Sequence, residues 1–149
     1  MVCPPAHTYP YDEVRLPASL LLTLNEMVVK AQAQFLQTGG IHASALFTIE
    51  GKLLNIYEDV GRHNALDKLI GSCWLNGLLT LQSHILFLSG RISFELMQKA
   101  VMVGIKVVVA VGAPSTMAVA IAEEYGITLI GFLRENRFNI YAGAERIMM

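Results

Sequence analysis

The chain has 149 residues, of which 54% are apolar and 15% are charged, and its formal net charge is -1. This length is enough for one domain with its own core, and the apolar share is too high for an intrinsically disordered chain. The 11 Lys and Arg side chains are balanced by 12 Asp and Glu side chains. That balance argues against nucleic-acid binding through bulk positive charge, so no nucleic-acid partner is expected.

The apolar excess does not predict a membrane span. A transmembrane helix needs about 20 apolar residues in a row, but polar residues interrupt 20–29, and glycine and proline follow 107–111. Prolines stand near the N-terminus, where a secretory signal would have its apolar segment. Two cysteines cannot make a disulfide framework, which favours a reducing compartment. We therefore expect a cytoplasmic protein without a membrane span. Its surplus apolar surface is expected to form the interface of a homodimer.

The chain begins with a proline-rich segment, residues 1–18, that has no apolar period and is expected to form an extended arm. The remaining residues, 19–149, are expected to form a single domain. A helix is predicted over 19–37, with Ser19 as its N-cap and Gly39-Gly40 after its end. The apolar face expected for this helix consists of Leu20, Leu24, Met27, Val28, Ala31 and Phe35.

The rest of the chain reads as a mixed α/β domain. A hairpin is predicted from strands at 41–49 and 53–57, which flank the turn at 50–52. Short apolar strands then alternate with helices of about ten residues. The strands are predicted at 85–88, 106–111, 128–132 and, as an edge strand, 137–141, and the helices at 64–75, 93–103 and 115–125. This alternation predicts a mixed sheet, parallel in its second half, in a three-layer α/β/α domain.

Ligands of such sheets bind beyond the carboxyl ends of the strands, which directs attention to three loops. The first, at 58–64, has the highest density of polar side chains in the chain. Asp59 or Asn64 is expected to cap the following helix, and Arg62 and Lys68 offer contacts to an anion near the helix N-terminus. A capping turn with solvated charges is the alternative interpretation.

The second and third loops repeat this layout. Residues 89–93 place a serine, a glycine and an arginine at a strand end, followed by Ser93 as a possible N-cap. Glu95 and Lys99 are expected to pair one helical turn apart. Residues 112–116 are small and rich in hydroxyls. Helix capping explains each loop alone equally well, but three such loops at one edge point to a phosphate-bearing or nucleotide-like ligand.

Metal and cysteine chemistry have weaker support. No P-loop and no dinucleotide-binding fingerprint occurs. His42 and His63 lack cysteines or carboxylates at ligand spacing, so no metal site is expected, and His42 is expected to be a structural residue. At Ser44 the chain has serine where the His-x-Glu motif of zinc deaminases has glutamate. Cys73 is expected to be buried, whereas Cys3 is a weak candidate to carry a persulfide.

Several ordered motifs resemble those of the formate dehydrogenase accessory protein family, FdhD. They include Glu-Asp-Val-Gly-Arg-His-Asn-Ala-Leu-Asp-Lys and Ser-Gly-Arg-Ile-Ser-Phe-Glu-Leu-Met-Gln-Lys-Ala. The matching segments lie at 38–43, 58–71, 89–100, 112–116 and 131–134, and end at Tyr141. The resemblance runs from about residue 19 to the C-terminus.

This resemblance implies a sulfurtransferase. Such a protein takes sulfur as a persulfide from a cysteine desulfurase and passes it to the molybdenum cofactor, before insertion of that cofactor into formate dehydrogenase. The bound substrate would be the bis-molybdopterin guanine dinucleotide form of the cofactor. The implied fold is similar to that of cytidine deaminases, without their zinc site.

The resemblance also implies the position of the cofactor. Residues 133–138 lie where the family contacts the guanine dinucleotide, and Arg134 and Arg137 suit its phosphates. His63 is a possible proton-transfer group. Together with the three loops, the expected cofactor-binding residues are Gly61, Arg62, His63, Ser89, Gly90, Arg91, Ser115, Thr116, Leu133, Arg134, Glu135, Asn136, Arg137 and Phe138.

One feature of the family is missing. Its sulfur-carrying cysteines form a Cys-x-x-Cys loop upstream of the matching domain, and Cys3 and Cys73 do not have that spacing. Two interpretations are open: a piece of a longer sulfur carrier, or a short homologue that binds the cofactor as a non-catalytic chaperone or docking protein. A hydrolytic or deaminating enzyme on the same fold is disfavoured, because the metal ligands are missing.

Overall fold

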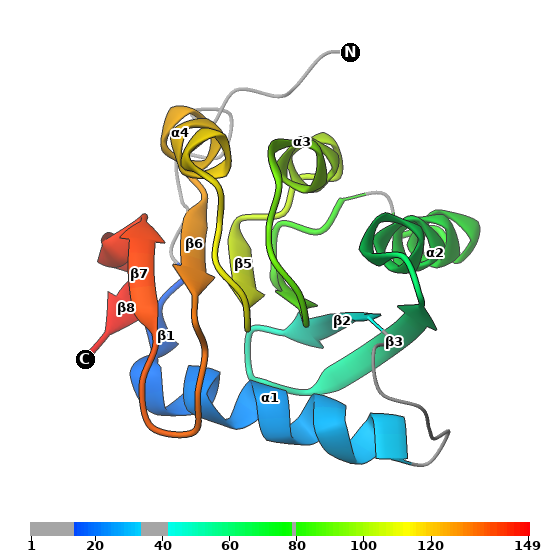
Figure 1. Ribbon diagram of the computed structural model, residues 1–149, viewed down its shortest axis with the longest axis horizontal. Helices are drawn as coiled ribbons and strands as arrows, with labels where there is room; N and C mark the ends of the chain where they lie inside the picture. The colour runs from blue at the N-terminus through cyan, green and yellow to red at the C-terminus, as the bar shows by residue number, and fades with distance from the viewer. Residues whose placement is uncertain (1–13, 34–41, 79) are drawn as a thin grey trace.

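The computed structural model describes residues 14–33, 42–78 and 80–149. A mixed six-stranded sheet with the order β3-β2-β4-β5-β6-β7 forms its centre (Figure 1). Its strands are β2 (His42–Thr48), β3 (Leu53–Asp59), β4 (His84–Leu88), β5 (Val107–Ala110), β6 (Thr128–Gly131) and β7 (Asn139–Ala142). Two short strands, β1 (Leu16–Pro17) and β8 (Ile147–Met148), pair in parallel apart from this sheet.

The strand directions bring the three loops predicted to bind a ligand, 58–64, 89–93 and 112–116, to one edge of the sheet. β4, β5 and β6 are parallel, whereas β2 is antiparallel to both β3 and β4, and β7 is antiparallel to β6. The first residue of β2, His42, is therefore paired with Asp59 at the end of β3. We call this side, where β3 to β6 end and β2 and β7 begin, the carboxyl edge.

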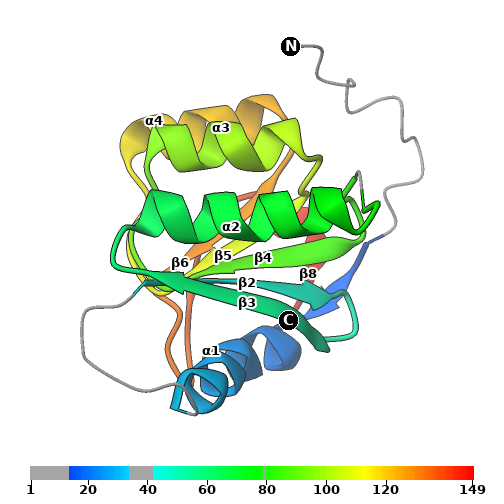
Figure 2. The ribbon, with the colours of Figure 1, turned by 90° about the vertical axis from the view of Figure 1, so that its right-hand side faces the viewer.

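The helices form layers on both faces of the sheet, as Figures 1 and 2 show. α1 (Ala18–Ala33) lies on one face, and α2 (Arg62–Leu75), α3 (Phe94–Met102) and α4 (Thr116–Glu124) cover the other. The three-layer α/β/α arrangement and the mixed sheet predicted from the sequence are confirmed.

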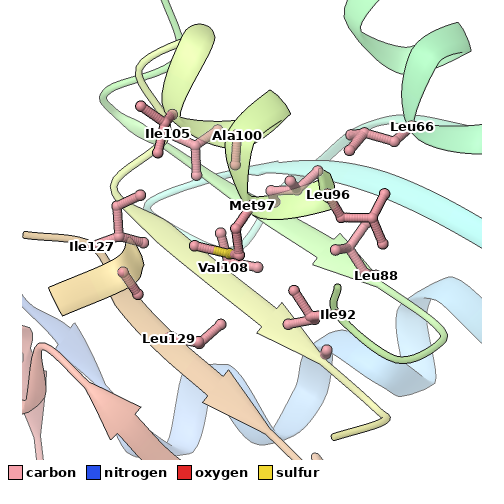
Figure 3. Close-up of a cluster of buried hydrophobic side chains, with 14 of the residues drawn as sticks. Leu66, Leu88, Ile92, Leu96, Met97, Ala100, Ile105, Val108, Ile127 and Leu129 are labelled. Atoms are coloured by element: carbon pink, nitrogen blue, oxygen red, sulfur yellow. The ribbon is translucent and has the colours of Figure 1, made fainter. Parts of the chain in front are cut away.

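Successive residues of the central strands enter different cores, because side chains alternate between the two faces of a strand. Leu86 and Val108 belong to the cluster under α2, α3 and α4, in which Figure 3 shows Val108. Phe87 and Val109 belong to the cluster against α1. Burial on both faces explains why these strands are continuous apolar runs in the sequence.

The N-terminal part of the domain departs from the prediction. α1 begins at Ala18, so Ser19 lies within the helix and is not its N-cap. Leu16 is fully buried and pairs with the C-terminal strand, so the end of the expected arm belongs to the fold. The predicted helix end, Gly39-Gly40 and residues 1–13 lie outside the described residues.

Elsewhere the predicted elements are confirmed within one or two residues. α2 starts at Arg62, two residues earlier than predicted, with Gly61 as its N-cap. The edge strand predicted at 137–141 is observed as β7. In the part of the chain that the structure describes, no helix is long and apolar enough to span a membrane.

Candidate functional site

Backbone hydrogen bonds join the loops at the carboxyl edge to one another. The Gly112 N–H donates to the Gly90 carbonyl at 3.2 Å, and the Gly112 carbonyl accepts from the Phe132 N–H at 3.2 Å. The Ile92 N–H donates to the Ala113 carbonyl at 3.1 Å. The loops after β4, β5 and β6 therefore form one continuous surface, as the sequence predicted for the first two.

The start of α2 contacts the same surface through Gly90. A Cβ added to Gly90 would lie 3.0 Å from His42 Nδ1 and 3.8 Å from Arg62 Cδ. The His42 and Arg62 side chains therefore both lie against Gly90. The sequence predicts a structural role for His42, and the signal that places it at the site is its position opposite the end of β3, which depends on strand register.

The serines of these loops accept hydrogen bonds from the backbone. Ser89 Oγ accepts from the Ala43 N–H at 2.8 Å. Ser93 Oγ accepts from the Leu96 N–H at 3.2 Å, and Ser115 Oγ accepts from the Ala118 N–H at 3.1 Å. The capping interpretation is thus confirmed for Ser93 and Ser115. A serine hydroxyl that accepts one bond still has its hydrogen to donate, so capping does not exclude contact with a phosphate.

Asp59 organises the turn between β3 and α2. Its Oδ1 accepts from the Gly61 N–H at 2.9 Å, and its Oδ2 lies 2.9 Å from Lys68 Nζ. These two interactions hold the pKa of Asp59 below its ordinary value, and the hydrogen bond from Gly61 contributes more than the one from Lys68. The ion pair corrects one expectation: Lys68 binds Asp59 rather than being a free anion contact. Asn64 is also not the N-cap, because it lies inside α2.

Arginine is concentrated at this edge. The chain contains six arginines, and four of them, Arg62, Arg91, Arg134 and Arg137, lie in or directly after the loops of the carboxyl edge. The Arg62 Nε atom is buried and has no hydrogen-bond partner among the described residues. Among the described residues, no hydrogen bond or ion pair engages the exposed Arg91 guanidinium.

Arg134 is held by backbone carbonyls of the segments that follow β5 and β6. Its Nη1 donates to the Val111 carbonyl at 2.9 Å and to the Leu133 carbonyl at 2.8 Å, and its backbone N–H donates to the Arg137 carbonyl. These bonds fix the position of an exposed guanidinium. The remaining N–H groups of the fork can bind an anion.

The segment 133–138 divides between the surface and the core. Leu133 is fully buried against the α1 side of the sheet, and Phe138 packs against the same cluster. Glu135 lines a cavity of about 570 Å³ together with residues of α1, beside which the β6–β7 loop runs (Figure 1). The Leu133 side chain therefore stabilises the loop, and the two arginines and Asn136 provide its exposed polar groups.

Phe132 has an unusual backbone conformation that the sequence did not indicate. Its φ of 53° lies in the left-handed region, although it is not glycine. The ring is 39% exposed, and the Arg134 guanidinium lies 5.8 Å from its centroid. Strained residues of this kind are often found at functional sites.

Comparison with known proteins identifies the family. A model of the FdhD/NarQ family matches residues 4–148. The chain belongs to the FdhD/NarQ family. Curated relatives named "Sulfur carrier protein FdhD" include those of Streptomyces avermitilis, 55% identical over 136 residues, and Picrophilus torridus, 46% identical over 143 residues. These matches cover 91% and 96% of this chain but 48% and 55% of the relatives. The chain thus spans about half the length of the curated FdhD relatives that it matches.

One solved structure agrees with the FdhD/NarQ assignment, and a second shares the fold. A crystal structure of a putative formate dehydrogenase accessory protein from Desulfotalea psychrophila matches with a TM-score of 0.81 and 29% identity. The match covers 90% of this chain and 59% of the other. A mutant of NE0047, solved in complex with 8-azaguanine, has a TM-score of 0.54 and 12% identity over 91% of this chain and 90% of the other, a likeness of fold alone.

The FdhD relatives are named for carrying sulfur, but the cysteine that this structure describes is poorly suited to that chemistry. Cys73 is 3% exposed in α2, as predicted, and burial raises the pKa of its thiol. A thiol reacts as thiolate, so burial slows both deprotonation and attack. Among the described residues, no group of three or more His, Cys, Asp or Glu side chains lies together as a possible metal site.

We expect Cys73 to resist alkylation in the folded protein. Iodoacetamide at neutral pH should leave Cys73 unmodified over a period in which the urea-unfolded chain is modified completely, because unfolding exposes the thiol. Peptide mass spectrometry distinguishes Cys73 from Cys3. Equal rates of Cys73 modification with and without urea would contradict the buried position.

Proposed function

We propose that this chain binds the molybdenum cofactor in its bis-molybdopterin guanine dinucleotide form and takes part in its sulfuration before insertion into formate dehydrogenase. The observation that carries the cofactor site is the group of four arginines at the carboxyl edge: Arg91, Arg134 and Arg137 lie on loops that are joined by hydrogen bonds, and Arg62 begins α2 beside Gly90. Guanidinium groups bind phosphate oxygens through paired N–H donors, and each guanine dinucleotide carries a diphosphate. Membership of the FdhD/NarQ family supports the sulfuration step.

The local chemistry of the edge fits an anionic ligand. The Arg62 Nε is a buried donor without a partner in the described part of the chain, a costly arrangement that an anion would relieve. Gly61 supplies no side-chain cap to α2, so the first amides of this helix face the same edge without a capping oxygen. We assign Arg62, Arg91, Arg134 and Arg137 to the phosphates, and the hydroxyls of Ser89 and Ser115 to further hydrogen bonds.

His63 is assigned a role beside these phosphates. It is the second residue of α2 and follows Arg62 directly, so it lies at the helix start that faces the edge. An imidazole ring has one nitrogen that can donate a proton and one that can accept one. In our proposal His63 binds the ligand or transfers a proton, and it is not the sulfur-carrying group.

A titration with GDP tests the cofactor site. GDP contains the guanine and diphosphate of the ligand, so the wild-type chain should bind it saturably. Arg91→Ala should raise the Kd about tenfold or more, because a charge-assisted hydrogen bond contributes about 1.5–3 kcal/mol. Arg134→Ala should weaken binding similarly, although it also removes bonds to Val111 and Leu133.

The matched control is Lys52→Ala. Lys52 is an exposed cation in the β2–β3 turn, at the opposite edge of the sheet, so its removal changes the net charge equally without touching the site. The Kd of this variant should stay within about twofold of wild type, as exposed charges at a distance are screened by salt. The assigned site is contradicted if the wild-type chain shows no saturable GDP binding. It is also contradicted if the Arg91→Ala and Arg134→Ala variants bind GDP with the Kd of wild type.

The burial of Cys73 favours a second candidate function: a cofactor-binding chaperone or docking protein that carries no sulfur itself. The two candidates differ at Cys3, which lies outside the described residues. Incubation with a cysteine desulfurase and L-cysteine, followed by mass spectrometry, separates them. A persulfide on Cys3 supports the sulfurtransferase, whereas GDP binding without any persulfide supports the chaperone.

The partners follow from the same proposal. We propose a cysteine desulfurase as sulfur donor, formate dehydrogenase as the recipient of the cofactor, and the cytoplasm as the place of the transfer. We also propose a homodimer, because α2, α3 and α4 expose large apolar side chains. These are Trp74, Leu75, Met102 and Met117.

A further inference from the structure

Lys68 connects α2 to the end of the edge strand β3. Its Nζ donates to the Glu58 carbonyl at 2.9 Å and lies 2.9 Å from Asp59 Oδ2. β3 pairs only with β2 in the six-stranded sheet, so these bonds hold its outer end. The network continues to the other face, where Glu58 Oε2 accepts from Gln32 Nε2 of α1 at 2.9 Å.

Asp59 binds the chain on both sides of the proposed site residues. It accepts from the Gly61 N–H and pairs with Lys68. Between these two points lie Arg62 and His63, the first residues of α2. The carboxylate and the ammonium therefore close a loop of chain that contains both ligand-facing side chains.

This ion pair has a particular importance for α2, compared with the neighbouring helices. Ser93 and Ser115 fix the starts of α3 and α4 by capping them. Gly61 gives α2 no such cap. The start of α2 is fixed instead by Asp59, which lies before the helix and binds both the Gly61 N–H and Lys68 inside the helix.

We propose that Asp59 and Lys68 are positioning residues for the cofactor site, which hold Arg62 and His63 in the place where the diphosphate binds. This inference rests on the proposed function. It assigns the ion pair a role in affinity, in addition to any effect on stability, since misplacing a binding group by about 1 Å can cost far more than a lost surface contact.

The chain contains a matched control in the adjacent residue. Asp67 of α2 pairs with Lys99 of α3 at 2.8 Å, in place of the Glu95–Lys99 pair predicted from the sequence. Both pairs combine a half-exposed partner with a more buried one: the exposed fractions are 51% and 19% for Lys68 and Asp59, and 28% and 55% for Lys99 and Asp67. The Asp67–Lys99 pair joins two helices and does not contact the β3–α2 turn.

The test compares GDP binding and thermal unfolding of wild type, Lys68→Met, Lys68→Arg and Lys99→Met. Lys68→Met should raise the Kd for GDP about tenfold, and Lys68→Arg should restore it to within about threefold of wild type. Lys99→Met should bind as wild type, even where its Tm falls as much as that of Lys68→Met. A double variant with Asp59→Asn and Lys68→Met should bind no worse than the weaker single variant, since both remove the same pair.

The outcomes distinguish the positioning role of Asp59 and Lys68 from the proposed cofactor binding itself. If wild type binds GDP and Lys68→Met binds equally well, or if Lys99→Met weakens binding as much, the positioning role is wrong and the proposed function stands. If wild type does not bind GDP, both are overturned. Should Lys68→Met fail to fold, Asp59→Asn takes its place, and the same tenfold rise in the Kd for GDP is expected. The asparagine amide has nearly the volume of the carboxylate and keeps an oxygen that can accept from the Gly61 N–H.

Discussion

Replacing Phe87 with alanine should lower the free energy of unfolding by about 3–5 kcal/mol, the largest effect we expect from a single substitution. Phe87 lies in β4, inside the six-stranded sheet, and is fully buried. Its ring meets that of Phe47 edge-on, with centroids 6.4 Å apart and an interplanar angle of 70°. Alanine would leave a cavity that the strands on either side cannot collapse into.

Urea unfolding followed by circular dichroism measures this effect. Domains of this size are stabilised by about 5–15 kcal/mol, so the variant loses a large part of the total. Val29→Ala is the control, because Val29 is 52% exposed on α1, and it should change the stability by no more than about 0.5 kcal/mol. A loss below about 1 kcal/mol for Phe87→Ala would contradict the described packing of the α1-side core.

Adding a methyl group at Gly112 should damage both the fold and the site. A Cβ there would lie 2.8 Å from the carbonyl carbon and oxygen of Gly90 and from the Arg91 nitrogen. These are backbone atoms, which cannot rotate away as a side chain can. Gly112→Ala should therefore cost about 1–3 kcal/mol of stability and weaken GDP binding, because it separates the loops after β4 and β5.

Gly71→Ala provides the control for Gly112→Ala, because we expect it to raise the stability instead of lowering it. Gly71 lies inside α2, and a Cβ at that position meets nothing within 4 Å. Alanine is favoured over glycine in a helix by about 0.5–1 kcal/mol, so this variant should be more stable than wild type. Unfolding midpoints and GDP titrations of both variants measure these effects. Wild-type stability and affinity in Gly112→Ala would contradict the contact between the two loops.

The order of strands and helices was predictable because the apolar pattern changes along the chain. Alternating side chains around Gly51 indicated the hairpin, and the apolar runs within 85–88 and 106–111 indicated buried strands. The pairing of Leu16 with Ile147 was not predictable. Strands of two residues have no detectable period, and this pairing joins segments from opposite ends of the chain.

The candidate site was predictable as a set of loops but not as a set of contacts. The rule that ligands bind beyond the carboxyl ends of strands selected the loops with Gly61, Arg91 and Ser115. The contacts of Lys68 with Asp59, and of Gly90 with His42, depend on strand register and on how α2 lies across the sheet. Neither of these is encoded in local sequence patterns, and so Lys68 was expected to bind the ligand directly.

Mapping GDP on the folded protein by NMR tests the location of the cofactor site most directly. In ¹⁵N-labelled protein, added GDP should shift the backbone amide signals of 61–64, 89–93, 112–116 and 132–138, the loops of the carboxyl edge. The signals of the β2–β3 turn at 49–52, at the opposite edge, should stay in place. Saturable shifts confined to the opposite edge or to the groove that Gln98, Met102, Ile121 and Tyr125 line between α3 and α4, or no shifts at all, would contradict the proposed cofactor site.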